Sequence, residues 1–294
     1  MSVSTLAIIG ADGPALADPR IPQIRVEDVG LLRGESVFET TRIIGGAPVD
    51  LDGHLQRLAR SAAAIEVPLP DSHDFVRASW LAIRAWANPD GVLRLVATKG
   101  GDGGVPPVRF ALVTSLPAGL TELRLSGISA VTLPLGIPAR LRPDAPWLLG
   151  GVKATSYAVP MAGQRAAHAR GADDAIWVSS EGEILEGPTS TVLAVVGNAI
   201  YTPPAMEVGT LPGLTLARVR DIAEVVEQHI TVGQLAAAQE ILLVSSVRGA
   251  VPLNCLDGVA RPIGPFGRRL PNALEEHLRK VSAALTPPGA TAVR

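Results

Sequence analysis

The 294-residue sequence has few aromatic residues, 3% of the chain, and one cysteine, Cys255. A single cysteine cannot form an internal disulfide, and no group of cysteines and histidines has the spacing of a metal site. The 26 basic residues nearly balance the 28 acidic ones, so no charge excess favours nucleic acid or an anionic membrane as a partner. We find no export signal and no apolar run of about eighteen residues. We therefore expect a cytoplasmic protein that acts on small molecules.

Hydrophobic residues make up 47% of the chain, enough for a sizeable core in one large or two modest domains. The β-branched stretch 37–44 ends at Gly45-Gly46, which predicts a strand, a tight hairpin and a short return strand. Asp52 is the expected cap of the next helix, residues 54–65. Its apolar residues recur at helical spacing on one face. They are Leu55, Leu58, Ala62 and Ile65.

The remaining pattern predicts an α+β protein with two α/β domains and the active site between them. The first domain spans residues 1–118, a linker follows at 119–128 within a stretch rich in proline and glycine, and the second domain spans 129–294. Further helices are expected at 75–87, 161–171, 213–226 and 271–285, and the tail 286–294 is expected to fray. Further strands are expected at 92–100, 108–116, 128–135, 174–179, 191–196, 199–203 and 240–246.

Lys153 is the first candidate for chemistry. Its neighbours in GGVKATSY are apolar or small and leave space for a planar ligand beside the amine. An ammonium group is costly to strip of water, so a lysine kept in an apolar cleft is a candidate nucleophile. The alternative is a lysine at a helix start whose amine reaches solvent.

Three downstream features add to this candidate. Glu186 follows a hairpin-like stretch and precedes Gly187-Pro188, where its carboxylate can point into a cleft; the alternative is an exposed turn residue. The helix expected after Pro212-Gly213 begins near Thr215, so backbone N–H groups and a hydroxyl meet there, as in a phosphate site. Ser245-Ser246 ends a strand and offers further hydroxyls. Taken alone, the helix start is equally compatible with an ordinary helix cap, and the two serines alone favour a plain strand end.

Together these motifs resemble the class IV aminotransferases, the fold-type-IV pyridoxal-phosphate enzymes. The family includes D-amino-acid transaminases, branched-chain aminotransferases and 4-amino-4-deoxychorismate lyases. The resemblance covers nearly the whole chain, from LLRGESVFETTR and HLQRL through GGVKATSY and LEGPTSTV to LPGLTLARV and ILLVSS.

The resemblance implies a cofactor, pyridoxal 5'-phosphate, and a set of residues that bind it. Lys153 would be the catalytic residue that bonds covalently to the cofactor, and Glu186 would pair with the pyridine nitrogen. Arg57, Leu214, Thr215 and Ser246 would bind the phosphate. Tyr157, four residues after the lysine, is a candidate for orienting the cofactor or the lysine, and equally a structural tyrosine.

Two positions depart from the family pattern. Thr191-Val192-Leu193 stands where an asparagine with an apolar and an aromatic residue is common. Leu216 occupies the place of a basic residue near the helix start, and Arg218 follows two positions later. Both departures leave the cofactor-binding groups unchanged. They therefore affect the assignment to a subfamily and not the expected cofactor.

Substrate-binding candidates lie in the first domain. Arg33 and Arg94 are expected to bind a substrate carboxylate, since a guanidinium matches it with two hydrogen bonds, although each is also compatible with an ordinary surface arginine. Phe38 is expected to be an apolar wall or core. Lys99-Gly100-Gly101 stands where some D-amino-acid transaminases have Arg-x-His, so this chain needs another arginine arrangement.

Several functions stay open at this point. The preferred one is transamination between an amino acid, with D-amino acids favoured, and a keto acid such as pyruvate or 2-oxoglutarate. Alternatives are an aminodeoxychorismate lyase, a branched-chain aminotransferase, and a cofactor-free binding protein, against which the Lys153 and Glu186 pair argues. The resemblance also implies a homodimer in which Arg33 serves the neighbour's site, with neither nucleic acid nor membrane as a partner.

Overall fold

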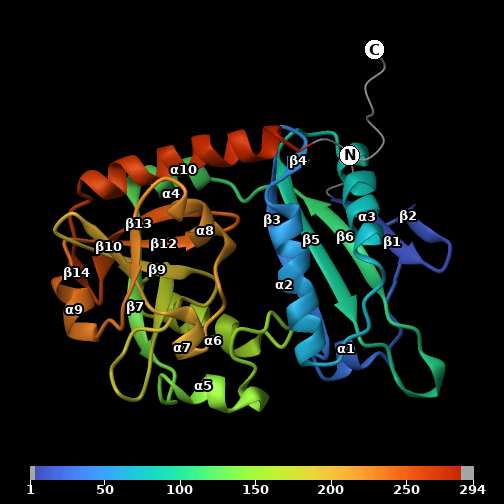
Figure 1. Cartoon of the computed structure of the whole chain (residues 1–294), viewed down its shortest axis with the longest axis horizontal. Helices are drawn as coiled ribbons and strands as arrows, with labels where there is room; N and C mark the ends of the chain where they lie inside the picture. Colours follow the sequence, from blue (N-terminus) through green and yellow to red (C-terminus); the bar gives the residue numbers. More distant parts are fainter. Residues whose placement is uncertain (1–3, 286–294) are drawn as a thin grey trace. The chain divides into compact units, whose positions relative to one another are not determined.

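The computed structural model describes residues 4–285, and the predicted fraying of 286–294 lies outside them. The chain divides into two units. Unit 1 contains the residues up to Pro117, Val152–Tyr157 and the residues from Leu278 onward; unit 2 contains Ala118–Gly151 and Ala158–His277. Each unit is built on its own sheet (Figure 1).

Unit 1 has a six-stranded antiparallel sheet in the order β2-β1-β6-β5-β3-β4. Helices α2 and α3 cover one face of it (Figure 1), because alternate residues of β3 and β5 point toward apolar helix residues. Leu58 of α2 and Leu93 of β5 are fully buried there, and each such side chain contributes roughly 1.5–3 kcal/mol. The elements are β1 Ser4–Gly10, β2 Gly13–Ala17, α1 Val29–Leu32, β3 Ser36–Ile44, β4 Ala47–Pro48, α2 Leu51–Ala64, α3 Ser72–Ala85, β5 Gly91–Thr98, the 3-10 helix Asp102–Gly104 and β6 Arg109–Thr114.

Unit 2 has a mixed eight-stranded sheet in the order β11-β10-β9-β12-β13-β7-β8, with β14 paired to β13. Helix α4 packs on β13, α6 on β7 and β8, and α8 on β12. The strands are β7 Ile128–Pro134, β8 Asp174–Val178, β9 Thr191–Val196, β10 Ala199–Thr202, β11 Val225–Glu227, β12 Glu240–Ser245, β13 Gly249–Leu256 and β14 Val259–Ala260. The helices are α4 Leu120–Ser126, α5 Leu141–Asp144, the 3-10 helix Pro146–Leu148, α6 Ala158–Ala169, α7 Ala205–Val208, α8 Leu214–Arg220, α9 Val232–Ala237 and α10 Pro265–Ala283.

The hairpin and helix predicted near the start of the chain are confirmed. Gly45 and Gly46 both have positive φ, 61° and 82°, as a two-residue hairpin turn between β3 and β4 requires. The predicted cap is wrong, because α2 begins one residue before Asp52. The N-cap is Asp50, in the left-handed conformation, and its carbonyl accepts the His54 N–H.

Three other expectations differ from the structure. The predicted linker 119–128 is mostly helix α4, whose packing on β13 places it in unit 2. The helix expected at 213–226 ends at Arg220, because Val225–Glu227 pairs as strand β11 with β10. The last helix begins at Pro265, before the expected Pro271, since the Glu240 carboxylate accepts the N–H groups of Phe266 and Gly267 in its first turn.

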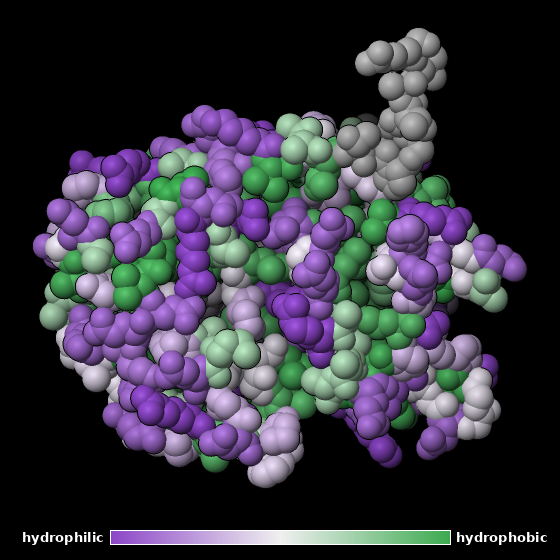
Figure 2. All heavy atoms as spheres, in the orientation of Figure 1, coloured by the Kyte–Doolittle hydropathy of each residue, from purple (hydrophilic) through white to green (hydrophobic). Residues whose placement is uncertain are grey.

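No helix within residues 4–285 is long and apolar enough to cross a bilayer. The face drawn in Figure 2 carries hydrophilic and hydrophobic residues interspersed with one another. This mixed surface agrees with the near balance of charges in the sequence.

Candidate active site

The segment Val152–Tyr157 belongs to unit 1 although it is distant in sequence from the rest of that unit. It lies along the start of β3: Phe38 N–H donates to the Lys153 carbonyl at 3.1 Å and Thr155 N–H donates to Ser36 O at 2.8 Å. On its other side, Lys153 N–H donates to the Ser61 hydroxyl of α2 at 3.0 Å. The backbone of Lys153 is therefore fixed by both a strand and a helix.

The side chain of Lys153 is half-buried among aromatic rings. Its Nζ lies 4.5 Å from the centre of the Phe38 ring and 5.9 Å from that of Tyr157. The two rings meet edge to face, with centres 5.3 Å apart. The ring faces attract the ammonium and restrict the positions open to the side chain. The structure thus brings together three of the residues that the sequence singled out.

The two arginines proposed for the substrate carboxylate have different surroundings. Arg94 is exposed on β5, and its guanidinium carbon lies 5.8 Å from the centre of the Phe38 ring. Phe38 therefore contacts both Arg94 and Lys153. Arg33 is exposed at the end of α1, and its backbone N–H closes that helix on Val29 O.

Arg57 lies in a buried ionic cluster that the sequence reading missed. Its Nε and Nη2 donate to the two carboxylate oxygens of Glu39, at 2.7 and 2.9 Å, and His54 Nδ1 lies 2.6 Å from Glu39 Oε2. Burial of Glu39 raises its pKa, but hydrogen bonds from Arg57 and His54 outweigh this and hold the pKa at about 2. The signal was present in the sequence: Glu39 sits on a strand before a helix that carries His54, Arg57 and Ser61 at spacings of three and four residues.

Glu186 lies in unit 2 after β8. Its backbone carbonyl accepts the Trp177 N–H at 2.8 Å. Its half-buried carboxylate accepts the Leu211 N–H at 3.3 Å and lies 3.7 Å from Arg142 Nη1. Both contacts come from unit 2, so they fix the position of the carboxylate within that unit.

The phosphate-binding candidates of unit 2 meet where α8 begins and β12 ends. Thr215, buried in the first turn of α8, donates its hydroxyl to the Ser246 hydroxyl at 3.3 Å. Leu214 is the first residue of α8 and is half-buried. A Cβ on the preceding Gly213 would lie 2.6 Å from Thr191 Oγ1, so glycine is required for this close approach.

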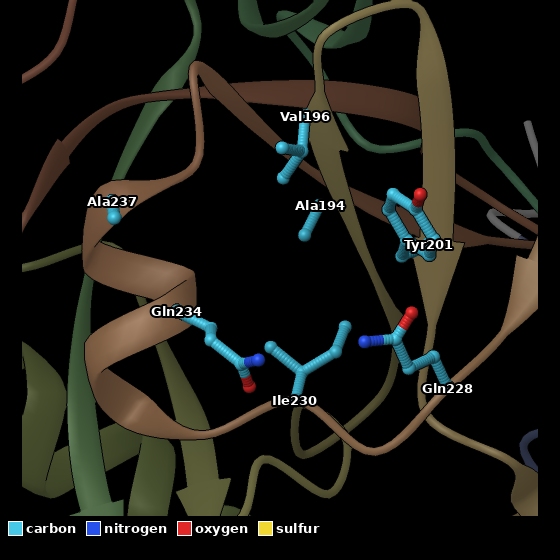
Figure 3. A pocket seen from close by; sticks show the side chains of 7 residues that line it. All are labelled: Ala194, Val196, Tyr201, Gln228, Ile230, Gln234 and Ala237. Atoms are coloured by element: carbon cyan, nitrogen blue, oxygen red, sulfur yellow. The ribbon is translucent and has the colours of Figure 1, made fainter.

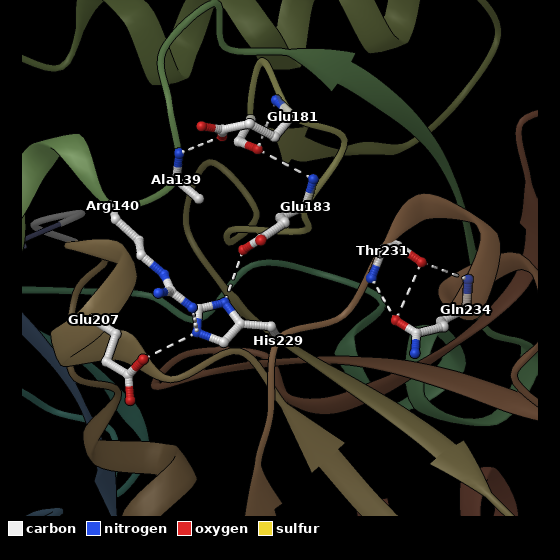
Figure 4. A network of polar contacts seen from close by, with 9 residues as sticks. Ala139, Arg140, Glu181, Glu183, Glu207, His229, Thr231 and Gln234 are labelled. Carbon is white, nitrogen blue, oxygen red and sulfur yellow. Dashed lines mark hydrogen bonds and ion pairs between the residues drawn. The ribbon is translucent and has the colours of Figure 1, made fainter.

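Unit 2 has two further polar features away from these residues. A cavity of about 250 Å³ lies between β9, β10 and α9 and contains none of the predicted site residues (Figure 3). Its lining consists of Ala194, Val196, Tyr201, Gln228, Ile230, Gln234 and Ala237. Elsewhere, His229 bridges Glu183 and Glu207, with Arg140 beside it (Figure 4).

An antiparallel sheet and a mixed sheet, a lysine amine held over aromatic rings and a carboxylate with donors around it are features of an aminotransferase with an aldehyde cofactor. The sequence matches the amino-transferase class IV family over residues 36–254. The chain belongs to this family of pyridoxal-phosphate enzymes, and the predicted family, fold type, enzyme class and cofactor are confirmed.

Individual relatives agree with this assignment. A bifunctional aminodeoxychorismate lyase / D-amino acid transaminase from Mycobacterium tuberculosis is 35% identical, with 88% of this chain and 94% of the relative covered. The structure of a fold IV transaminase from Curtobacterium pusillum matches with 35% identity and a TM-score of 0.87 over 95% of this chain and 98% of that chain. A hypothetical aminotransferase from M. tuberculosis, in a form with α-ketoglutarate and PMP bound, matches with 32% identity and a TM-score of 0.86 over the same shares.

Proposed function

We propose that this enzyme moves an amino group between a D-amino acid and a 2-keto acid. The observation that carries the proposal is the placement of Lys153: its amine lies over Phe38 and Tyr157, and Phe38 also contacts Arg94. An amine that forms a reversible covalent bond and a guanidinium that binds a carboxylate are the two groups that an amino-acid substrate requires.

The residues present fit pyridoxal phosphate. Lys153 offers an amine to its aldehyde, Glu186 a carboxylate to its ring nitrogen, and Arg57, Leu214, Thr215 and Ser246 offer donors to its phosphate. When bound, the cofactor supplies an electron sink for the bond that breaks at the substrate carbon.

Lys153 would have a second task in the reaction. Its amine would take the proton from the substrate carbon as a general base and give it back as a general acid. The Ser61 and Phe38 hydrogen bonds keep its backbone in place during this transfer. Tyr157 packs against Phe38 and limits how far the amine moves.

Recognition of the substrate carboxylate falls to Arg94, with Arg33 as the second candidate. Lys99 does not supply the missing carboxylate-binding group, because its amine is 2.7 Å from Glu35 Oε2 and 3.3 Å from the Ile65 carbonyl. A lysine neutralised by a glutamate offers little attraction to a substrate carboxylate.

The second candidate function is an aminodeoxychorismate lyase that releases pyruvate and 4-aminobenzoate. The name of the M. tuberculosis relative, which combines both activities, supports keeping it. Branched-chain transamination is the third candidate, supported by a putative branched-chain-amino-acid aminotransferase from Methanocaldococcus jannaschii at 29% identity.

We propose further that the protein forms a homodimer. Exposed apolar side chains gather in the segment that leads to Arg33; they are Ile24, Val26, Leu31 and Leu32. A surface of this kind is typical of a protein interface, and a neighbouring subunit there would receive Arg33. Light scattering of the purified protein tests this, and a monomer at micromolar concentration contradicts it.

One set of assays separates the functions. Purified protein with pyridoxal phosphate is expected to show a cofactor absorbance band that Lys153→Ala lacks, whereas a cofactor-free binding protein shows none. D-alanine with 2-oxoglutarate is expected to yield pyruvate and glutamate. If only aminodeoxychorismate is converted, with 4-aminobenzoate released, the enzyme is the lyase; if only branched-chain L-amino acids react, it is the third candidate.

A further inference from the structure

The buried cluster of Glu39, His54 and Arg57 lies in unit 1 beside the segment that holds Lys153. All three side chains are at most 5% exposed. Glu39 follows Phe38 on β3, so the two side chains point to opposite faces of the sheet. Phe38 contacts the lysine amine while Glu39 contacts helix α2.

The contact between Glu39 and Arg57 fixes the orientation of the guanidinium. Two parallel hydrogen bonds, from Nε and Nη2, align the planar guanidinium with the planar carboxylate and remove its rotation. His54 bonds the same carboxylate and thereby fixes Glu39 in turn. The carboxylate thus takes the Nε–Nη2 edge of the guanidinium.

One helix face carries both this cluster and the support of the lysine. His54, Arg57 and Ser61 follow one another at three and four residues along α2, and Ser61 accepts the Lys153 N–H. A rotation or shift of α2 would therefore displace Arg57 and Lys153 together. Glu39, bound to β3, is the group that opposes such a shift at the Arg57 end.

We propose that Glu39 is a positioning residue that orients the Arg57 guanidinium toward the cofactor phosphate, with His54 holding the Glu39 carboxylate. This inference rests on the proposed role of Arg57. Glu39 neutralises part of the charge of Arg57, so its contribution to phosphate binding lies in geometry. The alternative is a cluster that only ties α2 to β3.

The test compares the binding of pyridoxal phosphate with that of pyridoxal, which has the same aldehyde and ring but no phosphate. Glu39→Gln keeps the size of the side chain and removes its charge. We expect this variant to bind pyridoxal phosphate about tenfold more weakly, the order expected for loss of a charge-assisted hydrogen bond, and pyridoxal as the wild type does. Dissociation constants are measured by absorbance titration of the cofactor-free protein.

Three further single variants and one double variant complete the design. Arg57→Ala is expected to abolish most of the preference for pyridoxal phosphate over pyridoxal. Adding Glu39→Gln to Arg57→Ala is expected to cause little further loss of this preference. His54→Gln is expected to reduce the preference for pyridoxal phosphate over pyridoxal, but by less than Glu39→Gln does. It replaces Glu39→Gln in the test if that variant does not fold. Glu35→Gln is the matched control, because Glu35 pairs with Lys99 and not with Arg57.

The outcomes separate the two levels of the proposal. If Glu39→Gln and His54→Gln weaken pyridoxal phosphate and pyridoxal equally, or lower only the melting temperature, the positioning role is wrong and the cluster is structural. If the wild type binds neither compound, the proposed function itself fails. An additive loss in the Glu39→Gln/Arg57→Ala double variant also overturns the proposal, since Glu39 would then act without Arg57.

Discussion

Two clusters with the same chemistry occupy different surroundings, one in each unit. In unit 1, Glu39 joins His54 and Arg57, and its side chain is 1% exposed. In unit 2, His229 joins Glu183, Glu207 and Arg140, and its side chain is 27% exposed. Each combines a histidine, an arginine and at least one carboxylate.

The pKa values of Glu39 and His229 are shifted in opposite directions, and in both clusters hydrogen bonds outweigh burial. The pKa of Glu39 is held at about 2 because the hydrogen bonds from Arg57 and His54 exceed the cost of burial, so the carboxylate stays ionised at neutral pH. The hydrogen bond to Glu207 raises the pKa of His229, partial burial opposes it, and Glu183 adds to the rise. The Glu39 carboxylate is thus ionised around neutrality, while the pKa of His229 lies above its ordinary value of 6.5.

The Nε2 atom of His229 has two competing partners. It lies 3.0 Å from Glu207 Oε2 and 3.1 Å from Arg140 Nη2. A protonated Nε2 donates to the carboxylate, whereas a deprotonated Nε2 accepts from the arginine. Titration therefore exchanges a bond to α7 for a bond to the residue that precedes α5 (Figure 4).

The largest expected difference between the clusters is in stability. Glu39→Ala leaves Arg57 buried without its carboxylate, and this should lower the free energy of unfolding by roughly 3–5 kcal/mol. Glu183→Ala in the exposed cluster should lower it by about 1 kcal/mol or less. Urea unfolding followed by circular dichroism measures both, and equal losses would remove the distinction drawn from burial.

The second expected difference is the loss of the stability contributed by Glu39 at acidic pH. The folded pKa of Glu39 lies below its ordinary value of 4.5, so its stabilisation is complete above pH 4.5 and is lost as the pH falls toward about 2. The stability difference between wild type and Glu39→Gln should consequently shrink as the pH falls over this range. A difference that does not change between pH 4.5 and about 2 contradicts the assignment.

The smallest expected effect concerns His229. Its folded pKa is raised above 6.5, so its stabilisation is complete below pH 6.5 and is lost as the pH rises through the folded pKa. We expect the free energy of unfolding of the wild type to exceed that of His229→Gln by about 0.2–1 kcal/mol at mildly acidic pH and by less at alkaline pH. Thermal melts across this pH range measure it, with His73→Gln, whose side chain lies outside the cluster, as the control.

Much of the fold followed from local patterns. Two glycines after a β-branched run specify the hairpin at Gly45-Gly46, and apolar residues at helical spacing specify the buried face of α2 at Leu55 and Leu58. The linker at 119–128 was misread because proline and glycine flank a short helix whose burial depends on β13, more than a hundred residues later. The composition of a short segment does not show a contact with a strand so distant in the sequence.

The sequence by itself determined the family and its chemistry, because Lys153, Glu186 and the glycine and hydroxyl motifs are ordered along the chain and each residue type carries its reactivity with it. Only the tertiary structure decided which residues meet. Lys153 joined Phe38 and Ser61 in unit 1, and both carboxylate oxygens of Glu39 accepted hydrogen bonds from one edge of the Arg57 guanidinium, because strand pairing and helix packing brought distant segments into contact. Hydrogen bonds, opposed by burial, then shifted the pKa values of Glu39 and His229, and both contributions exist only in the folded chain.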